Sequence, residues 1–294
     1  MRTIFTMPAL VLTAASVPAE RVVTGDGVTA ATIAGAKGTL RIDPAGTSMP
    51  IVTSDFAERA GLKKGFIAIG YAVGPERVKG STDVASIGLG AEPFKRRIAW
   101  TPLAFTPAAD GVIGPGGVPE PVVRFVLGPA RAGERTVTLP MMTQGGVASG
   151  WGERYARIDV GGEPMRVRFD PHHPRTLATA AAAARIATAQ GGTLSGAPRM
   201  TEIAFGIERP VRDMTLARAL TVGPLAVLAM GVRTGDVGSA AAIREQDGDP
   251  DEVIVAAGKK RDPSRDRLSI GADLLSRCSS LVFDKPAKLI RLTC

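Results

Sequence analysis

The stretch LRIDPAGTSMPIVTSDFAERAGL, residues 40–62, ends an apolar run in a carboxylate. The run stops at Asp43, a turn follows at Pro44-Ala45-Gly46, and a second apolar segment leads into SDFAERAGL. That last segment predicts a short helix with Ser54 as its N-cap. Asp-Pro commonly begins a turn, so Asp43 taken alone is a turn former at a strand end. A functional role for this carboxylate depends on whether the pattern occurs again.

A second copy of the pattern lies at residues 160–187, VGGEPMRVRFDPHHPRTLATAAAAARIA. Gly35 precedes Asp43 by eight residues, and Gly162 precedes Asp170 by eight. Each Asp follows an apolar residue and is followed by proline, a turn and an Ala/Arg-containing helical stretch. The sequence therefore predicts an internal repeat with one aspartate in each copy.

The two halves also end alike. DGVIGPGGV (110–118) and LSIGADLLSR (268–277) both place apolar residues close before a glycine, at position 114 or 271. β-favouring segments separated by Gly, Pro and Asp turns lie between these landmarks. We predict two mostly-β lobes joined around residues 143–153.

Composition and charge narrow the classes of protein. The chain has 294 residues with 45% hydrophobic content, enough for one large domain or two lobes with their own cores. The formal net charge is +8, but the Lys and Arg are scattered and form only short clusters such as Lys95-Arg96-Arg97. Without a basic stripe interleaved with aromatics, we expect no nucleic-acid partner.

The N-terminal segment has the layout of a secretory signal. One Arg precedes an uncharged, mostly apolar segment and then small residues, with a cleavage site at Val17-Pro18-Ala19. The alternative is a disordered or strand-forming N-terminus. No later segment has about 18 uninterrupted apolar residues, so we expect no transmembrane span and a periplasmic or secreted protein.

Two cysteines, Cys278 and Cys294, bracket two apolar segments around a Lys-Pro-Ala turn. In an antiparallel hairpin centred on Pro286, residues whose numbers sum to 572 lie opposite each other, for example Asp284 and Lys288. The numbers of the two cysteines also sum to 572, so they could face each other across the open end of the hairpin. A disulfide between them would add about 3 kcal/mol by closing a loop of about 15 residues. The alternative is two unpaired thiols.

Two lobes, each with an aspartate at a strand end and a later apolar-apolar-glycine, resemble the aspartic peptidases of the pepsin and retropepsin type. The nearest resemblance is to bacterial retropepsin-like proteins with both lobes in one chain. The segment SIGADLLSRCSSLVFDKPAKLIRL (269–292) is similar to the second signature and closing hairpin of that family, and the resemblance covers roughly residues 30–294. It implies a bilobal acid-protease-like fold of two pseudo-two-fold-related, β-barrel-like lobes with short helices. With the signal peptide that the N-terminal pattern predicts at 1–19, the expected organisation is an N-terminal lobe at 20–150 and a C-terminal lobe at 151–294.

The same resemblance implies that Asp43 and Asp170 are the catalytic residues. Such a pair shares one proton, because two carboxylates so close cannot both ionise, and it supplies one acid and one base. The implied substrate is a polypeptide in the inter-lobe cleft, and no cofactor is implied. Tyr71, or residues 81–97, lies where a flap hairpin would cover that cleft.

Both loops depart from the family pattern after the aspartate. Pro44 and Pro171 occupy the place of a Thr or Ser, which removes a hydroxyl and an amide donor. Ala45 and His172 occupy the glycine place, although Gly46 could replace that glycine in the first loop. We therefore expect peptidase activity to be weak or absent.

Two alternatives remain open. The first is a non-catalytic relative that binds a peptide or other ligand in its cleft. The second is a metal site around Asp170, His172 and His173, although adjacent residues of a strand point to opposite faces. The oligomeric state is not predicted.

Overall fold

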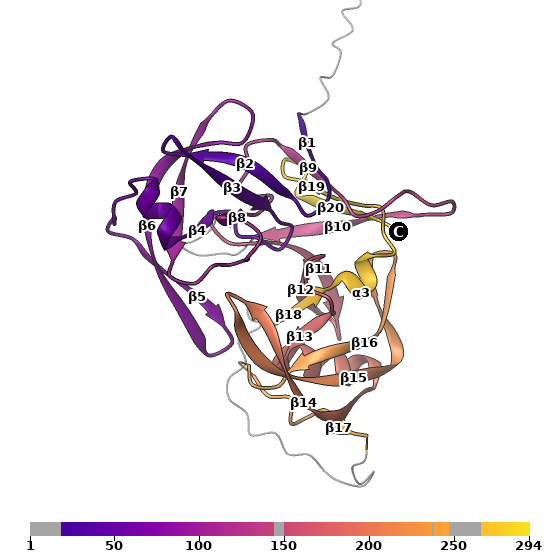
Figure 1. Ribbon diagram of the computed structural model, residues 1–294. Helices are drawn as coiled ribbons and strands as arrows, with labels where there is room; N and C mark the ends of the chain where they lie inside the picture. Colours follow the sequence, from indigo (N-terminus) through magenta and orange to yellow (C-terminus); the bar gives the residue numbers. More distant parts are fainter. Residues whose placement is uncertain (1–18, 144–149, 237, 247–265) are drawn as a thin grey trace, which may run out of the picture.

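The computed structural model describes residues 19–143, 150–236, 238–246 and 266–294. Of the described residues, 54% are in strands and 8% in helices, which confirms the prediction of a mostly β fold with short helices. The strands form a seven-stranded sheet and a thirteen-stranded sheet (Figure 1). Nearly all of the predicted signal peptide, residues 1–18, lies outside the described residues.

The seven-stranded sheet contains a six-stranded barrel. Its strand order is β2-β3-β8-β4-β7-β6-β5, and the pairing of β2 with β6 closes the barrel and leaves β5 attached outside it. Closure of this kind removes exposed sheet edges. The bounds are β2 Val28–Ile33, β3 Ala36–Ile42, β4 Ile51–Thr53, β5 Ala68–Val73, β6 Glu76–Gly88, β7 Phe94–Thr101 and β8 Gly111–Ile113.

The larger sheet has the order β1-β9-β19-β20-β10-β11-β12-β18-β13-β16-β15-β14-β17. Most of its strands come from the second half of the chain, but β1, β9 and β10 precede residue 150. The bounds are β1 Glu20–Val23, β9 Val122–Val126, β10 Thr136–Thr143, β11 Arg154–Val160, β12 Glu163–Phe169, β13 Leu177–Thr179, β14 Gly192–Ala204, β15 Ile207–Val222, β16 Leu225–Arg233, β17 Arg244–Glu245, β18 Arg267–Ile270, β19 Ser280–Asp284 and β20 Leu289–Thr293.

Along a run of seven strands, neighbouring strands pair in the same relative directions in both sheets. Among the described strands, the β2–β6 pairing that closes the smaller sheet has no counterpart in the larger one. In the smaller sheet β3 is parallel to β8, and β4 is antiparallel to β8 and parallel to β7. In the larger sheet β12 is parallel to β18, and β13 is antiparallel to β18 and parallel to β16. Asp43 directly follows β3, and Asp170 directly follows β12, so the two aspartates leave corresponding strands.

Among the described residues, three short helices lie beside the strands: α1 Ser54–Arg59, α2 Ala180–Gln190 and α3 Ala272–Leu275. The prediction that Ser54 caps the first helix is wrong by one residue. Thr53 has extended backbone angles, and its hydroxyl accepts the amide of Phe56 at 3.2 Å, whereas Ser54 is already helical. The Ala-rich second helix ends at Gly191, whose φ of 75° suits glycine.

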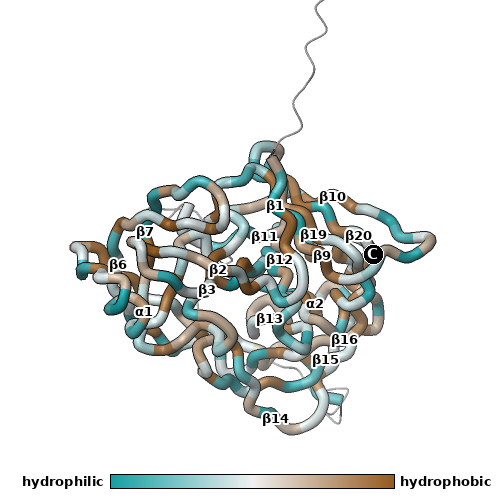
Figure 2. Tube along the Cα trace, turned by 45° about the horizontal axis from the view of Figure 1, so that its top comes forward, coloured by the Kyte–Doolittle hydropathy of each residue, from teal (hydrophilic) through white to brown (hydrophobic). Residues whose placement is uncertain are grey.

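Apolar residues of both halves pack into one large core. Apolar and polar stretches alternate along the chain (Figure 2). The largest fully buried side chains include Phe56, Phe169 and Phe283. Phe169 ends β12 immediately before Asp170, so the core fixes the strand from which this aspartate leaves.

The C-terminal hairpin carries the disulfide, but its register differs from the prediction. Cys278 and Cys294 are bonded, with their Cα atoms 3.8 Å apart. The ladder pairs Val282 with Arg291 rather than with Ile290. A four-residue turn shifts the hairpin centre, because Lys288 donates to the carbonyl of Lys285 and takes a φ of 56°. A disulfide is compatible with an extracellular or periplasmic protein.

Within the described ranges, no helix has the length and apolar character needed to span a membrane.

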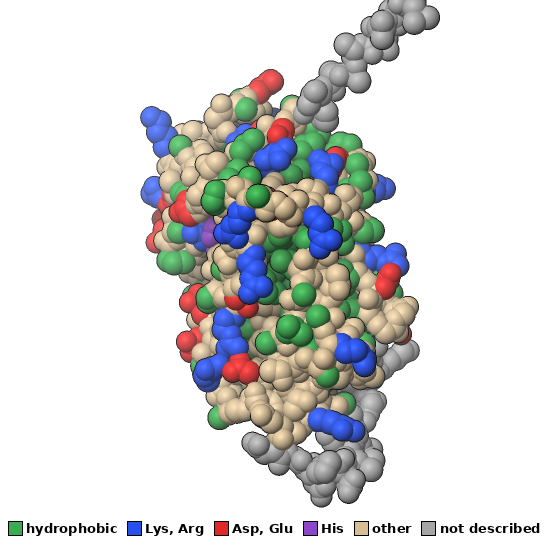
Figure 3. All heavy atoms as spheres, turned by 90° about the vertical axis from the view of Figure 1, so that its right-hand side faces the viewer, with side chains coloured by type: hydrophobic (Ala, Val, Ile, Leu, Met, Phe, Trp, Pro, Cys, Tyr) green, Lys and Arg blue, Asp and Glu red, His purple; other side chains and the backbone are tan. Residues whose placement is uncertain are grey.

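On the face seen in Figure 3, Lys and Arg side chains lie among Asp and Glu side chains and apolar residues. They do not gather in one patch on this face.

Candidate functional site

Asp43 begins a tight turn at the end of β3. Its amide donates to the carbonyl of Ile113 in β8 at 3.0 Å, and its carbonyl accepts the amide of Gly46 at 2.9 Å. Its carboxyl oxygen Oδ1 accepts the amide of Ala45 at 2.7 Å. Pro44 thus sits in the second position of a four-residue turn, where its fixed φ is favourable. The amide that bonds the carboxylate belongs to Ala45, so Gly46 does not supply it.

Asp170 begins a corresponding turn at the end of β12. Its amide donates to the carbonyl of Ile270 in β18 at 2.8 Å, and its carbonyl accepts the amide of His173 at 3.2 Å. The same amide contacts the carboxylate Oδ1 at 3.2 Å. Pro171 again takes the second turn position. The two prolines are therefore explained locally as turn residues.

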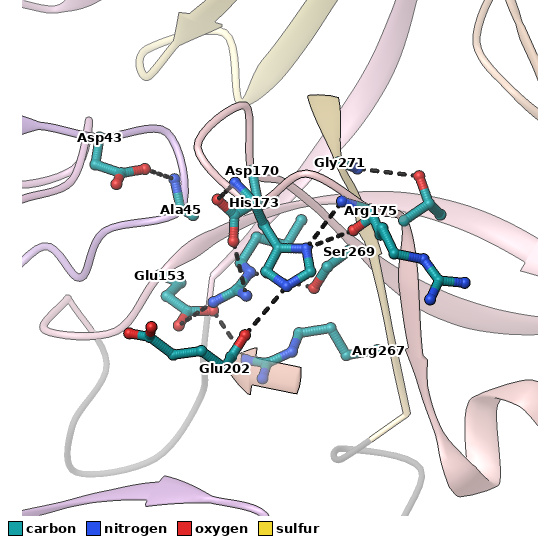
Figure 4. Close-up of polar contacts among 12 residues, drawn as sticks. Asp43, Ala45, Glu153, Asp170, His173, Arg175, Glu202, Arg267, Ser269 and Gly271 are labelled. Atoms are coloured by element: carbon teal, nitrogen blue, oxygen red, sulfur yellow. Dashed lines mark hydrogen bonds and ion pairs between the residues drawn. The ribbon is translucent and has the colours of Figure 1, made fainter. Parts of the chain in front are cut away.

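The two aspartates line one cavity of about 320 Å³. Asp43 is 3% exposed and Asp170 is 8% exposed. Figure 4 shows the two side chains coming from separate loops. Charged side chains also line this cavity, including Arg41, Arg168 and Glu202. The structure thus brings together the two residues that the repeat singles out.

The prolines after the aspartates line a different cavity. Pro44 and Pro171 lie with Ile42, Phe125 and Asp26 around a second space of about 330 Å³. His172 lines both cavities. Each aspartate thus lines the first space and the proline after it lines the second.

Arg168 connects Asp170 to a buried carboxylate. Its Nη2 lies 3.1 Å from Asp170 Oδ2, and its Nη1 lies 3.4 Å from Glu153 Oε1. Arg168 and Asp170 are two residues apart, so the alternation of β12 places them on one side. Because the carboxylates of Asp170 and Glu153 are both buried, Arg168 compensates negative charges that water cannot reach.

Glu153 is the centre of a wider network. Arg267 contacts its Oε2 at 3.2 Å, the Tyr71 hydroxyl donates to Oε1 at 2.8 Å, and the Tyr155 hydroxyl donates to Oε2. Burial alone would raise the pKa of Glu153, but Arg267 and Arg168, with both tyrosine hydroxyls, hold it below its ordinary value. Glu153 is therefore a buried anion that holds Arg168 in place.

The environment of Asp43 favours its neutral form. Burial, followed by the negative charge of Asp170, raises the pKa of Asp43 from 3.8 to about 7. The Ala45 amide and the charges of Arg168 and Arg41 oppose this shift. Below about pH 7 the cavity therefore contains a protonated Asp43 beside an arginine-paired Asp170.

Two hairpins meet beside the cavity. Tyr71 of the β5–β6 hairpin packs edge-on against Phe205 at the tip of the β14–β15 hairpin, with ring centroids 5.0 Å apart. Phe105 lies 5.0 Å from the Phe205 ring and itself lines the cavity. Tyr71 is therefore a packing and hydrogen-bonding residue here, and it is not among the residues that line the cavity.

The histidines gain no support as metal ligands. His173 Nδ1 lies 2.6 Å from the carbonyl of Arg175, and its Nε2 lies 3.2 Å from the carbonyl of Glu202 (Figure 4). Both ring nitrogens thus face backbone oxygens. In the part of the chain that the structure describes, no three His, Cys, Asp or Glu side chains converge in a way that could hold a metal.

Sequence reasoning missed the arginines of the site. Both motifs read Arg-apolar-Asp-Pro, with Arg41 before Asp43 and Arg168 before Asp170. This shared arginine was a usable signal, because a charge two residues before a strand-end aspartate faces the same side. Glu153 had no comparable signal, since its partners come from distant segments.

No protein-family model matches this chain, and the search of curated proteins finds no match.

Proposed function

We propose that this chain is an aspartic-peptidase-like protein in which Asp43 and Asp170 form an acid pair. In this proposal the cavity binds a segment of polypeptide, and the two aspartates hydrolyse its peptide bonds. Hydrolysis is slower than it would be for an aspartate pair without a cation such as Arg168 beside it. The observation that carries the proposal is that both aspartates line one cavity, where burial, followed by the negative charge of Asp170, raises the pKa of Asp43.

The strand pairing supports a two-lobed arrangement with residues 20–150 and 151–294 as lobes. The order β2-β3-β8-β4-β7-β6-β5 corresponds strand by strand to β11-β12-β18-β13-β16-β15-β14. Each aspartate follows the second strand of its series and donates its amide to an isoleucine carbonyl of the third. An internal repeat would produce this correspondence, as it does in acid-protease-like folds.

The proposed chemistry divides two roles between the aspartates. Asp170 accepts a proton from a water whose oxygen attacks the peptide carbonyl carbon, while Asp43 donates its proton to the carbonyl oxygen. The resulting tetrahedral diol collapses when the C–N bond breaks. The leaving nitrogen takes the proton held by Asp170, and one diol hydroxyl gives its proton to Asp43 as the new C=O bond forms, which restores the starting pair. The water supplies the OH of the new acid and the H of the new amine.

Arg168 limits this reaction in the proposal. The guanidinium of Arg168, 3.1 Å from Asp170 Oδ2, occupies that oxygen with a charge-assisted hydrogen bond, so the carboxylate has one oxygen fewer to accept a proton from water. The pair also lacks the hydroxyl and glycine that usually follow each aspartate.

Incubation with denatured casein between pH 3 and pH 9 tests this proposal. Wild-type protein should release peptides slowly below about pH 7, where Asp43 is protonated, and release should fall above that pH. The Asp43→Asn/Asp170→Asn double variant should release none. Equal release by both proteins would assign the activity to a contaminant and contradict the proposal.

A second candidate function is polypeptide binding without cleavage, which the Arg168 ion pair favours. In that case casein peptides would bind the wild-type protein and remain intact at every pH. Mass spectrometry of the incubated peptides separates the two functions, since only hydrolysis produces new termini.

We also propose export through a cleaved signal peptide at residues 1–19, which the disulfide supports. N-terminal sequencing of protein recovered from an exporting bacterial host should begin at Glu20; an intact Met1 would contradict this part of the proposal.

A further inference from the structure

Arg41 is the cation of the cavity whose charge no carboxylate balances. It lies in β3 two residues before Asp43 and lines the cavity. Its Nη1 donates to the hydroxyl of Thr106 at 2.9 Å. Its Nε is buried and has no hydrogen-bond partner. Among the ion pairs formed by the described residues, none contains Arg41.

The other charges near Arg41 are already matched. Arg168 and Arg267 together balance Glu153 and Asp170. Asp43 is neutral below about pH 7. Glu202 also lines the cavity, but it is exposed to solvent, which screens its charge. The guanidinium of Arg41 is therefore the uncompensated charge of this space in weakly acidic solution.

The Nε atom without a partner shows that the protein leaves part of the hydrogen-bonding capacity of Arg41 unused. A buried guanidinium nitrogen without a partner has lost its water and gained nothing in return. A carboxylate accepts two parallel hydrogen bonds from a guanidinium, and these bonds are stronger than neutral ones. The cavity volume of about 320 Å³ is sufficient for such a group with neighbouring ligand atoms.

We propose that the cavity binds a carboxylate of its polypeptide ligand at Arg41, supplied by an acidic side chain or by a chain terminus. This inference rests on the proposed function, because it names the ligand class of the same site. Arg41 is the specificity-determining residue in this assignment, and Thr106 positions it.

The test uses fluorescence polarisation at pH 6 with four versions of one ten-residue casein peptide that binds the protein. The versions combine Glu or Gln at one internal position with a free or an amidated C-terminus. The wild-type protein should bind the Gln, amidated version at least tenfold more weakly than the best acidic version. The two single changes show whether the side chain or the terminus supplies the carboxylate.

Two variants assign the preference to Arg41. Arg41→Met should bind all four peptides alike, whereas Arg41→Lys should retain part of the preference. Thr106→Val, which removes the bond to Arg41 without removing its charge, should reduce the preference less than Arg41→Met does. Circular dichroism establishes that each variant is folded, and the wild-type comparison needs no variant at all.

The outcomes separate this inference from the proposed function. Equal wild-type binding of all four peptides would overturn the carboxylate assignment and leave polypeptide binding in place. A preference that persists in folded Arg41→Met would overturn the role of Arg41. If no casein peptide binds, the proposed function fails and the carboxylate site fails with it.

Discussion

The buried carboxyl of Asp43 makes a specific prediction about the pH dependence of stability. Its pKa is raised from 3.8 to about 7 on folding, so the folded state holds a proton that the unfolded state has lost. The contribution of Asp43 to stability is therefore greatest in acid and falls as pH rises from about 4 to about 7. The Asp43→Asn variant lacks this titration, so over that window wild-type protein should lose about 4 kcal/mol relative to the variant.

Urea unfolding of both proteins at half-unit pH steps measures this difference. Asp159→Asn, at a side chain that is 61% exposed, controls for the loss of one negative charge. Parallel stability curves for wild-type protein and Asp43→Asn would contradict the buried, proton-holding role of Asp43.

Arg168 should be far more important for stability than an arginine in an exposed ion pair. Replacing it with Met leaves Asp170 without its cation and Glu153 with one cation fewer, so we expect a loss of about 3–5 kcal/mol. Arg157→Met is the matched control, because its pair with Asp159 is exposed and should cost less than about 1 kcal/mol. Similar losses for the two variants, measured by urea unfolding, would contradict the buried network.

At the scale of elements, the contact between two glycines holds the Asp43 turn against β8. A Cβ added to Gly114 would lie 2.0 Å from the carbonyl oxygen of Gly46, so the two backbones would have to separate. Gly114→Ala should therefore cost several kcal/mol and displace Asp43, which thermal unfolding and the Asp43 titration would both detect. Gly70→Ala is the control, since its Cβ would meet only the Arg77 side chain at 3.8 Å. Equal melting temperatures for the two variants would show that the turn does not need this contact.

The disulfide joins Cys278, before β19, to Cys294, after β20, and so closes the open end of the C-terminal hairpin. Cys278 and Cys294 are 16 residues apart, and loss of the bridge should cost about 3 kcal/mol through the freedom it returns to the unfolded chain. The Cys278→Ser/Cys294→Ser variant should match wild-type protein in reducing buffer and unfold earlier than wild-type protein in oxidising buffer. Identical unfolding in oxidising buffer would contradict a stabilising bridge.

The hairpin also shows where sequence reasoning about elements stops. The apolar segments and the Pro286 turn predicted the hairpin and the cysteine pairing, and both are present. The register was wrong by one residue, because Lys288 enters the left-handed region and lengthens the turn. Local sequence rarely signals such a conformation in a lysine, so the register had to come from the structure.

At the scale of the molecule, the sequence indicated a repeat around the two aspartates, but it did not indicate the hydrogen-bond and ion-pair network around Glu153. Equal spacing from glycine to Asp-Pro predicted an internal repeat. Asp43 and Asp170 each follow a strand with a parallel neighbour, β8 or β18, while the two-lobed, pseudo-symmetric arrangement stays a prediction. Glu153 joins the site from a segment with no motif, because its contacts depend on how distant strands pack. Those contacts are long-range, and periodicity along one segment carries no information about them.

The central claim joins the two halves of the chain: one carboxyl from each contributes to a single coupled acid pair. The most direct measurement is the titration of the Asp43 side-chain carboxyl by carbon-13 NMR in wild-type protein and in Asp170→Asn. We predict a midpoint near 7 in wild-type protein and a lower midpoint in Asp170→Asn, because removing the neighbouring charge leaves burial as the main cause. An ordinary midpoint near 3.8 in wild-type protein, or one unchanged by Asp170→Asn, would contradict the pair.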